Sequence, residues 1–277
     1  MKIIEKIKKE LHINQIKPLN NKVYLSIAAI IKNEAPYLKE WIEYHKLLGV
    51  ERFYIYDNNS DDDTIDVLKQ YIKNGDVVYK LAKGKTMQMP AYKDAIYCYG
   101  NNTEWMAFID LDEFIVPVEK DTISEFLKEY EHFPSLAINW LLFDYNKHET
   151  KPEGLVIENY TRTDYGFKDN IYVKCIVRPR EVIDIKTAHA FVFKHDRRSV
   201  DSNYNVVKHS TNKNYCIDKI RINHYYTKSK EEYLKRIAKG NVFYDRNREF
   251  NKERFDFGVE HDTLVIDKYL KKLKNLL

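Results

Sequence analysis

An alternation of strand-like and helix-like segments over the first 115 residues constrains the fold of this chain more than any other feature. Residues 24–31 form the continuous apolar run YLSIAAII, which is typical of a parallel strand covered on both faces. Polar residues resume at Lys32, directly after this run. A helical spacing of apolar residues then runs from Leu38 to Leu48, and Gly49 is placed to end that helix. We therefore predict a strand followed directly by a helix.

The same pattern repeats further along the chain. The predicted strands are 52–56, 77–79 and 105–109, and the predicted helices are 64–75 and 91–99, with 83–90 as a loop. The helix over 64–75 is expected to bury Ile65, Leu68 and Ile72. Repeated strand–helix units imply a mostly parallel sheet, in which ligands bind outside the carboxyl ends of the strands. We expect the polar clusters that follow these strands to converge on one edge.

Beyond residue 116 the pattern is less regular. We predict a helix over 123–130, strands over 135–143 and 172–177, and a helix over 229–240. The last helix has a capping box, because Ser229 is followed three residues later by Glu232, and Gly240 follows its final turn. No repeat or linker divides the chain, so we expect a single domain over residues 1–277.

Composition excludes several classes of protein. The 46 basic and 42 acidic residues give a net charge of +4, which is too small to attract nucleic acid by itself. The chain has no apolar run of about 20 residues and no signal-peptide pattern, so we expect a cytoplasmic location. The cysteines, Cys98, Cys175 and Cys216, are few and widely spaced, as expected of reduced thiols.

Known ligand-binding loops are also absent from the sequence. The run that starts at Asp57 begins like an EF-hand loop, but Asp62 stands where the turn needs glycine and Leu68 where a bidentate glutamate is needed. The sequence contains neither a P-loop motif nor a G-x-G-x-x-G motif. Calcium sensing, P-loop chemistry and dinucleotide binding are therefore not favoured.

Asp110 and Asp112 are the strongest candidates for chemistry. They follow the predicted strand 105–109, and on an extended strand end their i, i+2 spacing directs both carboxylates to the same face. Two converging carboxylates repel each other unless a cation lies between them, and Mg²⁺ or Mn²⁺ with phosphate oxygens suits such a site. The alternative is a pair of solvated carboxylates at a strand end.

Four motifs together resemble glycosyltransferase family 92 and its bacterial relatives, within the GT-A class. The spacing N-E-x-x-Y-L-x-E-W-x-x-Y-H-x-x-x-G begins at Asn33, and Y-D-N-x-S-x-D begins at Tyr56. D-x-D-E-F begins at Asp110, and H-Y-x-x-K-S-x-E-E begins at His224. The resemblance extends from about residue 23 to residue 240.

This resemblance implies an α/β protein with a Rossmann-like GT-A domain, whose mostly parallel central sheet is flanked by helices. Residues 23–115 would form the nucleotide-sugar-binding half, 116–240 the acceptor-binding half and 241–277 a helical tail. The implied enzyme transfers a hexose, galactose by analogy, from a UDP-sugar. Its acceptor would be a glycan or lipid-linked glycan in surface polysaccharide or lipopolysaccharide synthesis. The implied cofactor is Mn²⁺ or Mg²⁺, bound to the donor diphosphate.

The resemblance also suggests roles for individual residues. The expected metal ligands are Asp110, Asp112 and His224. The expected donor contacts are Asn33, Glu34, Asp57, Gln88, Tyr92, Asp110, Lys174, Arg178 and Lys228. Five of these residues have plain structural alternatives: Asp57 as a helix cap, Glu34 as a helix-start carboxylate, His224 as a buried histidine bonded to backbone, and Lys174 with Arg178 as solvated strand charges.

An inverting transferase needs a general base to deprotonate the acceptor hydroxyl. The candidates are Asp144, Glu153 and His189, all in irregular segments beyond the D-x-D motif. Glu113 lies beside the two aspartates and is expected to contact them rather than act as the base. A reaction with retained configuration would need none of the three.

Two other functional classes remain open. A metal-dependent nucleotidyltransferase would share the D-x-D motif and the fold, and a non-catalytic sugar-binding protein would share the fold alone.

The two ends of the chain read as basic amphipathic helices. Their apolar positions are Ile3, Ile4, Ile7 and Leu11 at one end and Ile266, Leu270, Leu273 and Leu277 at the other. Such helices either rest on an anionic inner-membrane surface or pack on the domain.

Overall fold

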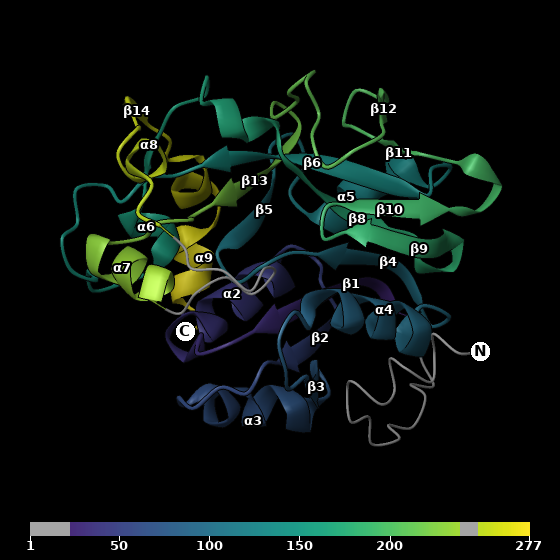
Figure 1. The fold of residues 1–277 in the computed structure, drawn as a ribbon, viewed down its shortest axis with the longest axis horizontal. Helices are drawn as coiled ribbons and strands as arrows, with labels where there is room; N and C mark the ends of the chain where they lie inside the picture. The colour runs from purple at the N-terminus through teal and green to yellow at the C-terminus, as the bar shows by residue number, and fades with distance from the viewer. Residues whose placement is uncertain (1–22, 239–248) are drawn as a thin grey trace.

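The computed structural model describes residues 23–238 and 249–277, and a twisted mixed sheet runs through its centre (Figure 1). The first four strands are β1 (Val23–Ile31), β2 (Arg52–Asp57), β3 (Val77–Leu81) and β4 (Thr103–Phe108). They pair in parallel in the order β3-β2-β1-β4. The helices between them are α2 (Ala35–Leu47), α3 (Thr64–Asn74) and α4 (Gln88–Tyr99). The predicted alternation of strands and helices is confirmed.

The sheet continues through strands from residue 113 onwards. These are β5 (Glu113–Pro117), β6 (Ser135–Leu142), β8 (Val173–Val177), β11 (Ser199–Val200), β12 (Val206–Val207) and β13 (Ile220–His224). β8 runs antiparallel to both β4 and β6, whereas β13 is parallel to β6 and antiparallel to β5. The predicted fold class, an α/β protein with a central, mostly parallel sheet flanked by helices, is confirmed. Strands β5 and β13 were not predicted.

Shorter elements complete the described fold. They are α5 (Ile123–Leu127), η1 (Lys128–Tyr130), α6 (Val156–Asn159), β7 (Arg162–Thr163), η2 (Lys168–Ile171), η3 (Pro179–Glu181), β9 (Val182–Thr187), β10 (Ala190–Phe193), η4 (Lys194–Asp196), α7 (Lys230–Ala238), α8 (Lys252–Phe255), β14 (Glu260–His261), η5 (Ile266–Leu270) and α9 (Lys271–Lys274). β9 pairs with β10 and β7 with β14, each as a small antiparallel sheet.

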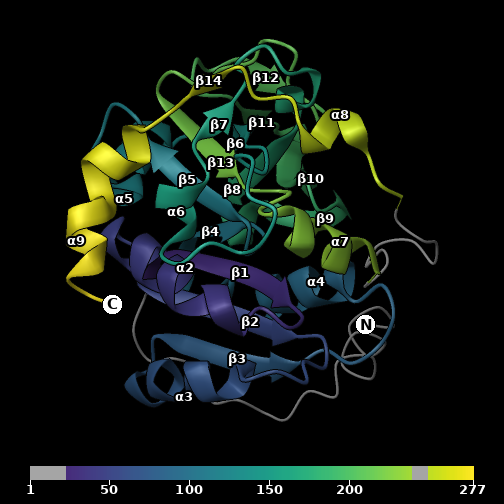
Figure 2. The ribbon, with the colours of Figure 1, turned by 90° about the vertical axis from the view of Figure 1, so that its left-hand side faces the viewer.

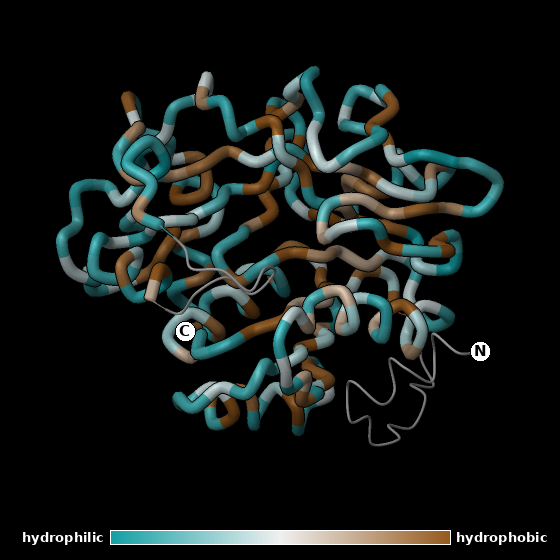
Figure 3. The backbone as a smooth tube through the Cα atoms, in the orientation of Figure 1, coloured by the Kyte–Doolittle hydropathy of each residue, from teal (hydrophilic) through white to brown (hydrophobic). Residues whose placement is uncertain are grey.

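The side chains of β1 alternate between two apolar clusters, one on each face of the sheet. Leu25, Ile27, Ala29 and Ile31 pack with residues of α2, whereas Ala28 packs with residues of α4. Figure 2 shows α4 on the opposite side of the sheet from α2, and Figure 3 shows that hydrophobic segments concentrate in the central strands. Burial on both faces explains why this strand reads as a continuous apolar run.

The ends of α2 and α3 and the start of α7 agree with the sequence signals, whereas Gly240, expected to follow the last turn of α7, lies outside the described residues. Gly49 and Gly75 adopt positive φ values of 92° and 82° after α2 and α3. α7 begins with the predicted capping box, in which Ser229 Oγ donates to Glu232 Oε2 at 2.6 Å. The expectation that Ile65 is buried is wrong, because Ile65 is 40% exposed and Tyr71 packs inward instead.

The C-terminal helical segment packs on the domain. Leu273 is fully buried, and the Tyr269 ring lies 5.6 Å from that of Tyr44 on α2. Lys268 Nζ donates to the backbone carbonyls of Pro117 and Lys120 at 2.8 Å each. The packed alternative is therefore confirmed for this end. The predicted N-terminal amphipathic helix lies outside the described residues.

Within residues 23–238 and 249–277, no helix has the length and apolar character needed to cross a membrane.

Candidate functional site

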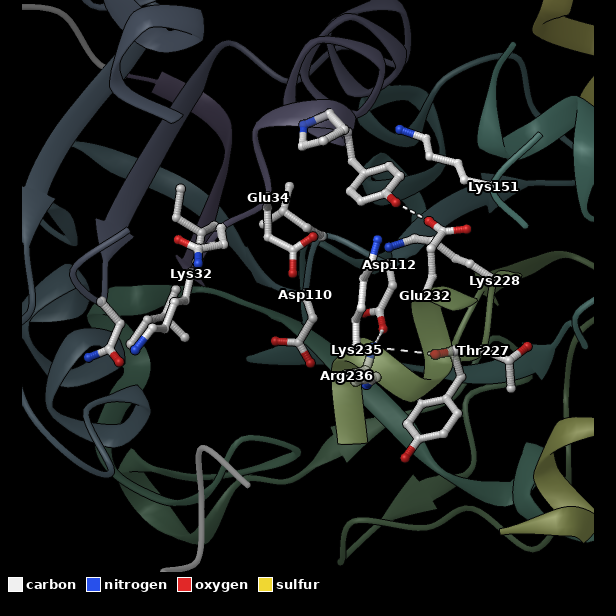
Figure 4. Close-up of a pocket in the computed structure, with 18 of the residues that line it drawn as sticks. Lys32, Glu34, Asp110, Asp112, Lys151, Thr227, Lys228, Glu232, Lys235 and Arg236 are labelled. Carbon is white, nitrogen blue, oxygen red and sulfur yellow. Dashed lines mark hydrogen bonds and ion pairs between the residues drawn. The ribbon is translucent and has the colours of Figure 1, made fainter. Parts of the chain in front are cut away.

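A cavity of about 370 Å³ opens at the carboxyl ends of β1, β2 and β4, and α7 forms its opposite wall (Figure 4). Its lining residues come from the ends of β1 and β2, the starts of α2 and α4, the turn after β4, one loop, the segment leading into α7 and α7 itself. They are Ile30, Ile31, Lys32, Asn33, Glu34, Pro36, Tyr37, Asn58, Gln88, Asp110, Leu111, Asp112, Lys151, Tyr226, Thr227, Lys228, Glu232, Lys235 and Arg236. The predicted convergence of polar strand ends is confirmed.

Asp110 is oriented by a buried lysine. Its carboxylate accepts hydrogen bonds from Lys174 Nζ at 2.9 Å and from Gln88 Nε2 at 3.1 Å. Lys174 is 1% exposed and also lies 3.3 Å from Glu113. Burial lowers the pKa of Lys174, but the Asp110 and Glu113 carboxylates outweigh it and raise the pKa well above the ordinary value. Lys174 is therefore a charged group that fixes Asp110 from below the cavity.

Asp112 lies between a histidine and an arginine. It forms an ion pair with Arg236 of α7, and its Oδ2 lies 3.5 Å from His224 Nε2. Burial raises the pKa of Asp112, but Arg236 and His224 outweigh it and hold the pKa well below the usual range. Neither ring nitrogen of the buried His224 has a hydrogen-bond partner. The expected alternative, a histidine bonded to backbone, is therefore not what the structure shows.

The spacing of Asp112 and His224 is compatible with a shared divalent cation, although His224 does not line the cavity. Two ligand atoms that each lie about 2.1 Å from a Mg²⁺ or Mn²⁺ ion are about 3 Å apart or slightly more, close to the observed separation. Asp110 faces Lys174 and Gln88 instead, because the two aspartates lie in a turn rather than on an extended strand end. The described residues contain no group of three or more His, Cys, Asp or Glu side chains placed to hold a metal. Of the three expected metal ligands, only Asp112 and His224 therefore lie close enough to share a cation.

The loop after β2 forms one side of the cavity. Asn33 has a φ of 55° and donates from Nδ2 to Asp61 Oδ1 at 2.6 Å, which joins the ends of β1 and β2. The Asp57 carboxylate accepts hydrogen bonds from Ser60 and from the Tyr79 hydroxyl, and it does not line the cavity. Asp57 therefore shapes the loop, whereas its neighbour Asn58 faces the cavity.

Of the remaining predicted donor contacts, Glu34, Gln88 and Lys228 line the cavity, whereas Tyr92 is fully buried beneath Gln88. Lys228 Nζ lies 3.7 Å from the centre of the Tyr37 ring.

Arg178 lies at the opposite end of the sheet. β8 is antiparallel to β4, with Val177 beside Met106, so Arg178 lies near the start of β4 and forms an ion pair with Glu104. The prediction that Lys174 and Arg178 direct two charges at the site is wrong for Arg178, because Arg178 lies four positions further along the extended chain, away from the cavity.

None of the three predicted bases lines the cavity. Asp144 is 1% exposed and accepts hydrogen bonds from the backbone N–H groups of Asn146 and Gly258 at 2.9 and 2.8 Å. Glu153 is exposed on a loop. His189 lies behind Trp140, with ring centres 5.4 Å apart, and burial together with Lys174 lowers its pKa to about 4. The structure does not favour any of them as a base.

Sequence reasoning missed several cavity residues, of which Arg236 is the most important. Helical periodicity places Glu232, Lys235 and Arg236 on one face of α7, so that signal was present in the sequence. Asn58 belongs to the Y-D-N-x-S-x-D motif but was not singled out, and Lys151 and Tyr226 carried no comparable signal.

The family model described as glycosyltransferase family 92 matches residues 21–254 of this chain. A glycosyltransferase family 92 protein of Oryza sativa subsp. japonica is 32% identical over 114 residues, which cover 41% of this chain and 20% of that protein. A beta-1,4-galactosyltransferase of Caenorhabditis elegans is 25% identical over 206 residues, which cover 68% of this chain and 45% of that protein. The chain therefore spans less than half the length of either relative.

Among solved structures, residues 1–349 of S. aureus TarS overlap 56% of this chain and 47% of their own chain, with 16% identity and a TM-score of 0.38. A likeness this weak carries no argument about the fold or the ligand.

Proposed function

The chain belongs to glycosyltransferase family 92, and we propose that it transfers a galactosyl group from UDP-galactose to a glycan hydroxyl with the help of a divalent cation. The galactosyl donor is supported by similar proteins of Caenorhabditis elegans and Arabidopsis thaliana, a beta-1,4-galactosyltransferase and a galactan beta-1,4-galactosyltransferase. Because the galactosyl group of UDP-galactose is α-linked, a β-linked product means inversion of configuration. The proposed acceptor, a surface polysaccharide or lipopolysaccharide chain, rests on the family resemblance alone.

The observation that carries this proposal is the distribution of charge across the cavity. Asp110 and Asp112 lie on one wall, and basic side chains from a loop, from the segment leading into α7 and from α7 itself line the facing side together with Glu232. These basic residues are Lys151, Lys228, Lys235 and Arg236. A nucleoside diphosphate with a bound cation matches both walls, because its phosphates need positive partners and its cation needs carboxylates.

The residues have separable roles in this proposal. Asp112 and His224 would hold the cation, which supplies positive charge to the departing diphosphate. Lys228 and Arg236 would contact the phosphates directly. Lys174 keeps Asp110 in place, and the rings of the buried Trp140 and the half-buried Tyr226 pack around His224 at centroid distances of 4.4 and 5.6 Å. Charge that is fixed before the reaction starts lowers the cost of developing charge on the leaving group.

The test is a panel of nucleotide sugars, with thermal unfolding and product release measured with and without Mn²⁺. We expect stabilisation by UDP-galactose that requires Mn²⁺, release of UDP, and a β-linked product by NMR. Asp112→Asn should abolish the Mn²⁺-dependent stabilisation, whereas Asp66→Asn, which removes an exposed carboxylate on α3, should not. Release of pyrophosphate would indicate the alternative nucleotidyltransferase. Binding of sugar with no effect of Mn²⁺ or of Asp112→Asn would indicate a non-catalytic sugar-binding protein.

A further inference from the structure

Arg236 is the one cavity cation that contacts the candidate metal ligand Asp112 by an ion pair within the described part of the chain. Its guanidinium carbon lies 4.4 Å from the centre of the Tyr226 ring, and Nη1 also donates to the Tyr226 carbonyl at 3.4 Å. The Nε atom is buried and has no hydrogen-bond partner. Arg236 therefore has a fixed stacking surface and an unused donor beside the cavity.

The Arg236 guanidinium and a bound cation would compete for the same carboxylate oxygen of Asp112. Arg236 pairs with Asp112 Oδ2, which is also the oxygen nearest to His224 Nε2. A cation bound to Asp112 and His224 would repel the guanidinium from that oxygen. A diphosphate entering the cavity with the cation offers the guanidinium a new partner of opposite charge, and the planar guanidinium suits phosphate oxygens.

The helix that carries Arg236 is anchored independently of this pair. Glu232, one turn earlier on α7, accepts hydrogen bonds from Ser229 at 2.6 Å and from the Tyr160 hydroxyl at 3.0 Å, and also from the Tyr37 hydroxyl. The guanidinium can thus change partners by side-chain rotation while α7 stays in place. Tyr226 would support the guanidinium in either position.

We propose that Arg236 is a donor-binding residue that exchanges partners when the donor binds, an inference that rests on the proposed function. In the free protein it neutralises Asp112. In the complex it binds the diphosphate, which leaves Asp112 available to the cation. Arg236 thereby makes binding of the cation and of the diphosphate mutually dependent.

The test compares binding of Mn²⁺ alone and of UDP with Mn²⁺ to the wild-type chain and to Arg236→Gln. Mn²⁺ binding is followed by electron paramagnetic resonance and UDP binding by isothermal titration calorimetry. We expect Arg236→Gln to tighten Mn²⁺ binding in the absence of UDP by about fivefold, because a partly exposed competing ion pair is removed. We expect it to weaken UDP binding by about 10- to 100-fold, because a charge-assisted hydrogen bond is lost.

Lys235→Gln is the matched control. It removes a neighbouring positive charge from the same helix and cavity wall, but Lys235 pairs with Glu231 rather than with Asp112. We expect it to weaken UDP binding less and to leave the affinity for Mn²⁺ alone unchanged. Arg236→Lys keeps the positive charge but lacks the planar guanidinium group. Its affinities for Mn²⁺ and for UDP should both lie between those of the wild type and of Arg236→Gln.

Opposite changes in the two affinities are the signature of the exchange. If Arg236→Gln lowers both affinities together, or changes neither, Arg236 has only a structural role and the proposal is wrong. If the wild-type chain itself does not bind UDP with Mn²⁺, the proposed function fails. Normal UDP binding by the wild type and an unaffected Arg236→Gln variant would overturn the role of Arg236 alone.

Discussion

Glu40 provides a direct test of how burial controls stability in this fold. It lies on α2 and is 6% exposed, and its carboxylate accepts hydrogen bonds from the backbone N–H groups of Val156 at 2.8 Å and Ile157 at 3.1 Å. Burial raises the pKa of Glu40 from 4.5 to about 7, although these two hydrogen bonds and Lys228 oppose the increase. Charging Glu40 therefore costs more in the folded chain than in the unfolded chain.

The sign of the effect follows from proton linkage. Between about pH 4.5 and pH 7 the folded state keeps a proton on Glu40 that the unfolded state has lost, so stability falls as pH rises through this window. A pKa difference of about 2.5 corresponds to about 3 kcal/mol of unfolding free energy. Above about pH 7, Glu40 no longer makes the unfolding free energy change with pH.

The measurement is urea unfolding of the wild type and of Glu40→Gln between pH 4.5 and pH 8, followed by tryptophan fluorescence. Glutamine is neutral at every pH and resembles the protonated carboxyl group, although its amide nitrogen cannot accept one of the two backbone hydrogen bonds. The stability of the wild type minus that of Glu40→Gln should fall by about 3 kcal/mol as pH rises across the window. The subtraction cancels titrations that both proteins share.

Glu129→Gln removes an exposed carboxylate and serves as the control. Its stability curve should run parallel to that of the wild type. If the curve of Glu40→Gln is also parallel to that of the wild type, burial does not perturb the pKa of Glu40 and the prediction is refuted.

Three further predictions concern packing and charge, and all are measured by chemical or thermal unfolding. Gly49→Ala should destabilise the chain by about 1–3 kcal/mol, because Gly49 has a φ of 92° and an added Cβ would lie 2.5 Å from Ser124 Oγ; an unchanged melting temperature would contradict this. Leu273→Ala should cost about 2–5 kcal/mol, since Leu273 is fully buried against the domain, and a loss below 0.5 kcal/mol would show that the C-terminal segment is not docked. Lys174→Met should cost about 3–5 kcal/mol, because it leaves the Asp110 and Glu113 carboxylates without their shared cation; equal stability would mean that Lys174 is not needed to hold them.

The parallel part of the fold was predictable from the sequence because its signals are local. The apolar run of β1 reflects burial on both faces, and the two glycines after α2 and α3 mark turns that need positive φ. Ile65 was misassigned because the same helical spacing fits Tyr71, and only the neighbouring elements decide which side chain faces the core. Periodicity alone does not distinguish two such registers.

The candidate site was only partly predictable, and the distance along the chain explains why. Asp110 and Asp112 directly follow one buried strand, so their position was enough to place both at the cavity, although they lie in a turn rather than on an extended strand end. The partner of Asp112 is Arg236, 124 residues further on, and no local pattern relates them. The prediction for Arg178 was wrong because the position of Arg178 depends on the direction of β8. β8 runs antiparallel to β4, and nothing in the sequence indicates that direction.

The pairing of β13 with β5 is the long-range contact on which the site depends. Its register places His224 opposite Glu113, and Tyr225 N donates to the Asp112 carbonyl at 2.8 Å. Because side chains alternate along a strand, a slip of one residue would turn His224 away from Asp112. The same strand leads into α7, so this register also sets where Arg236 meets the cavity. Carboxylates from the N-terminal half and cations from the C-terminal half therefore form one site only while this antiparallel pair is in register.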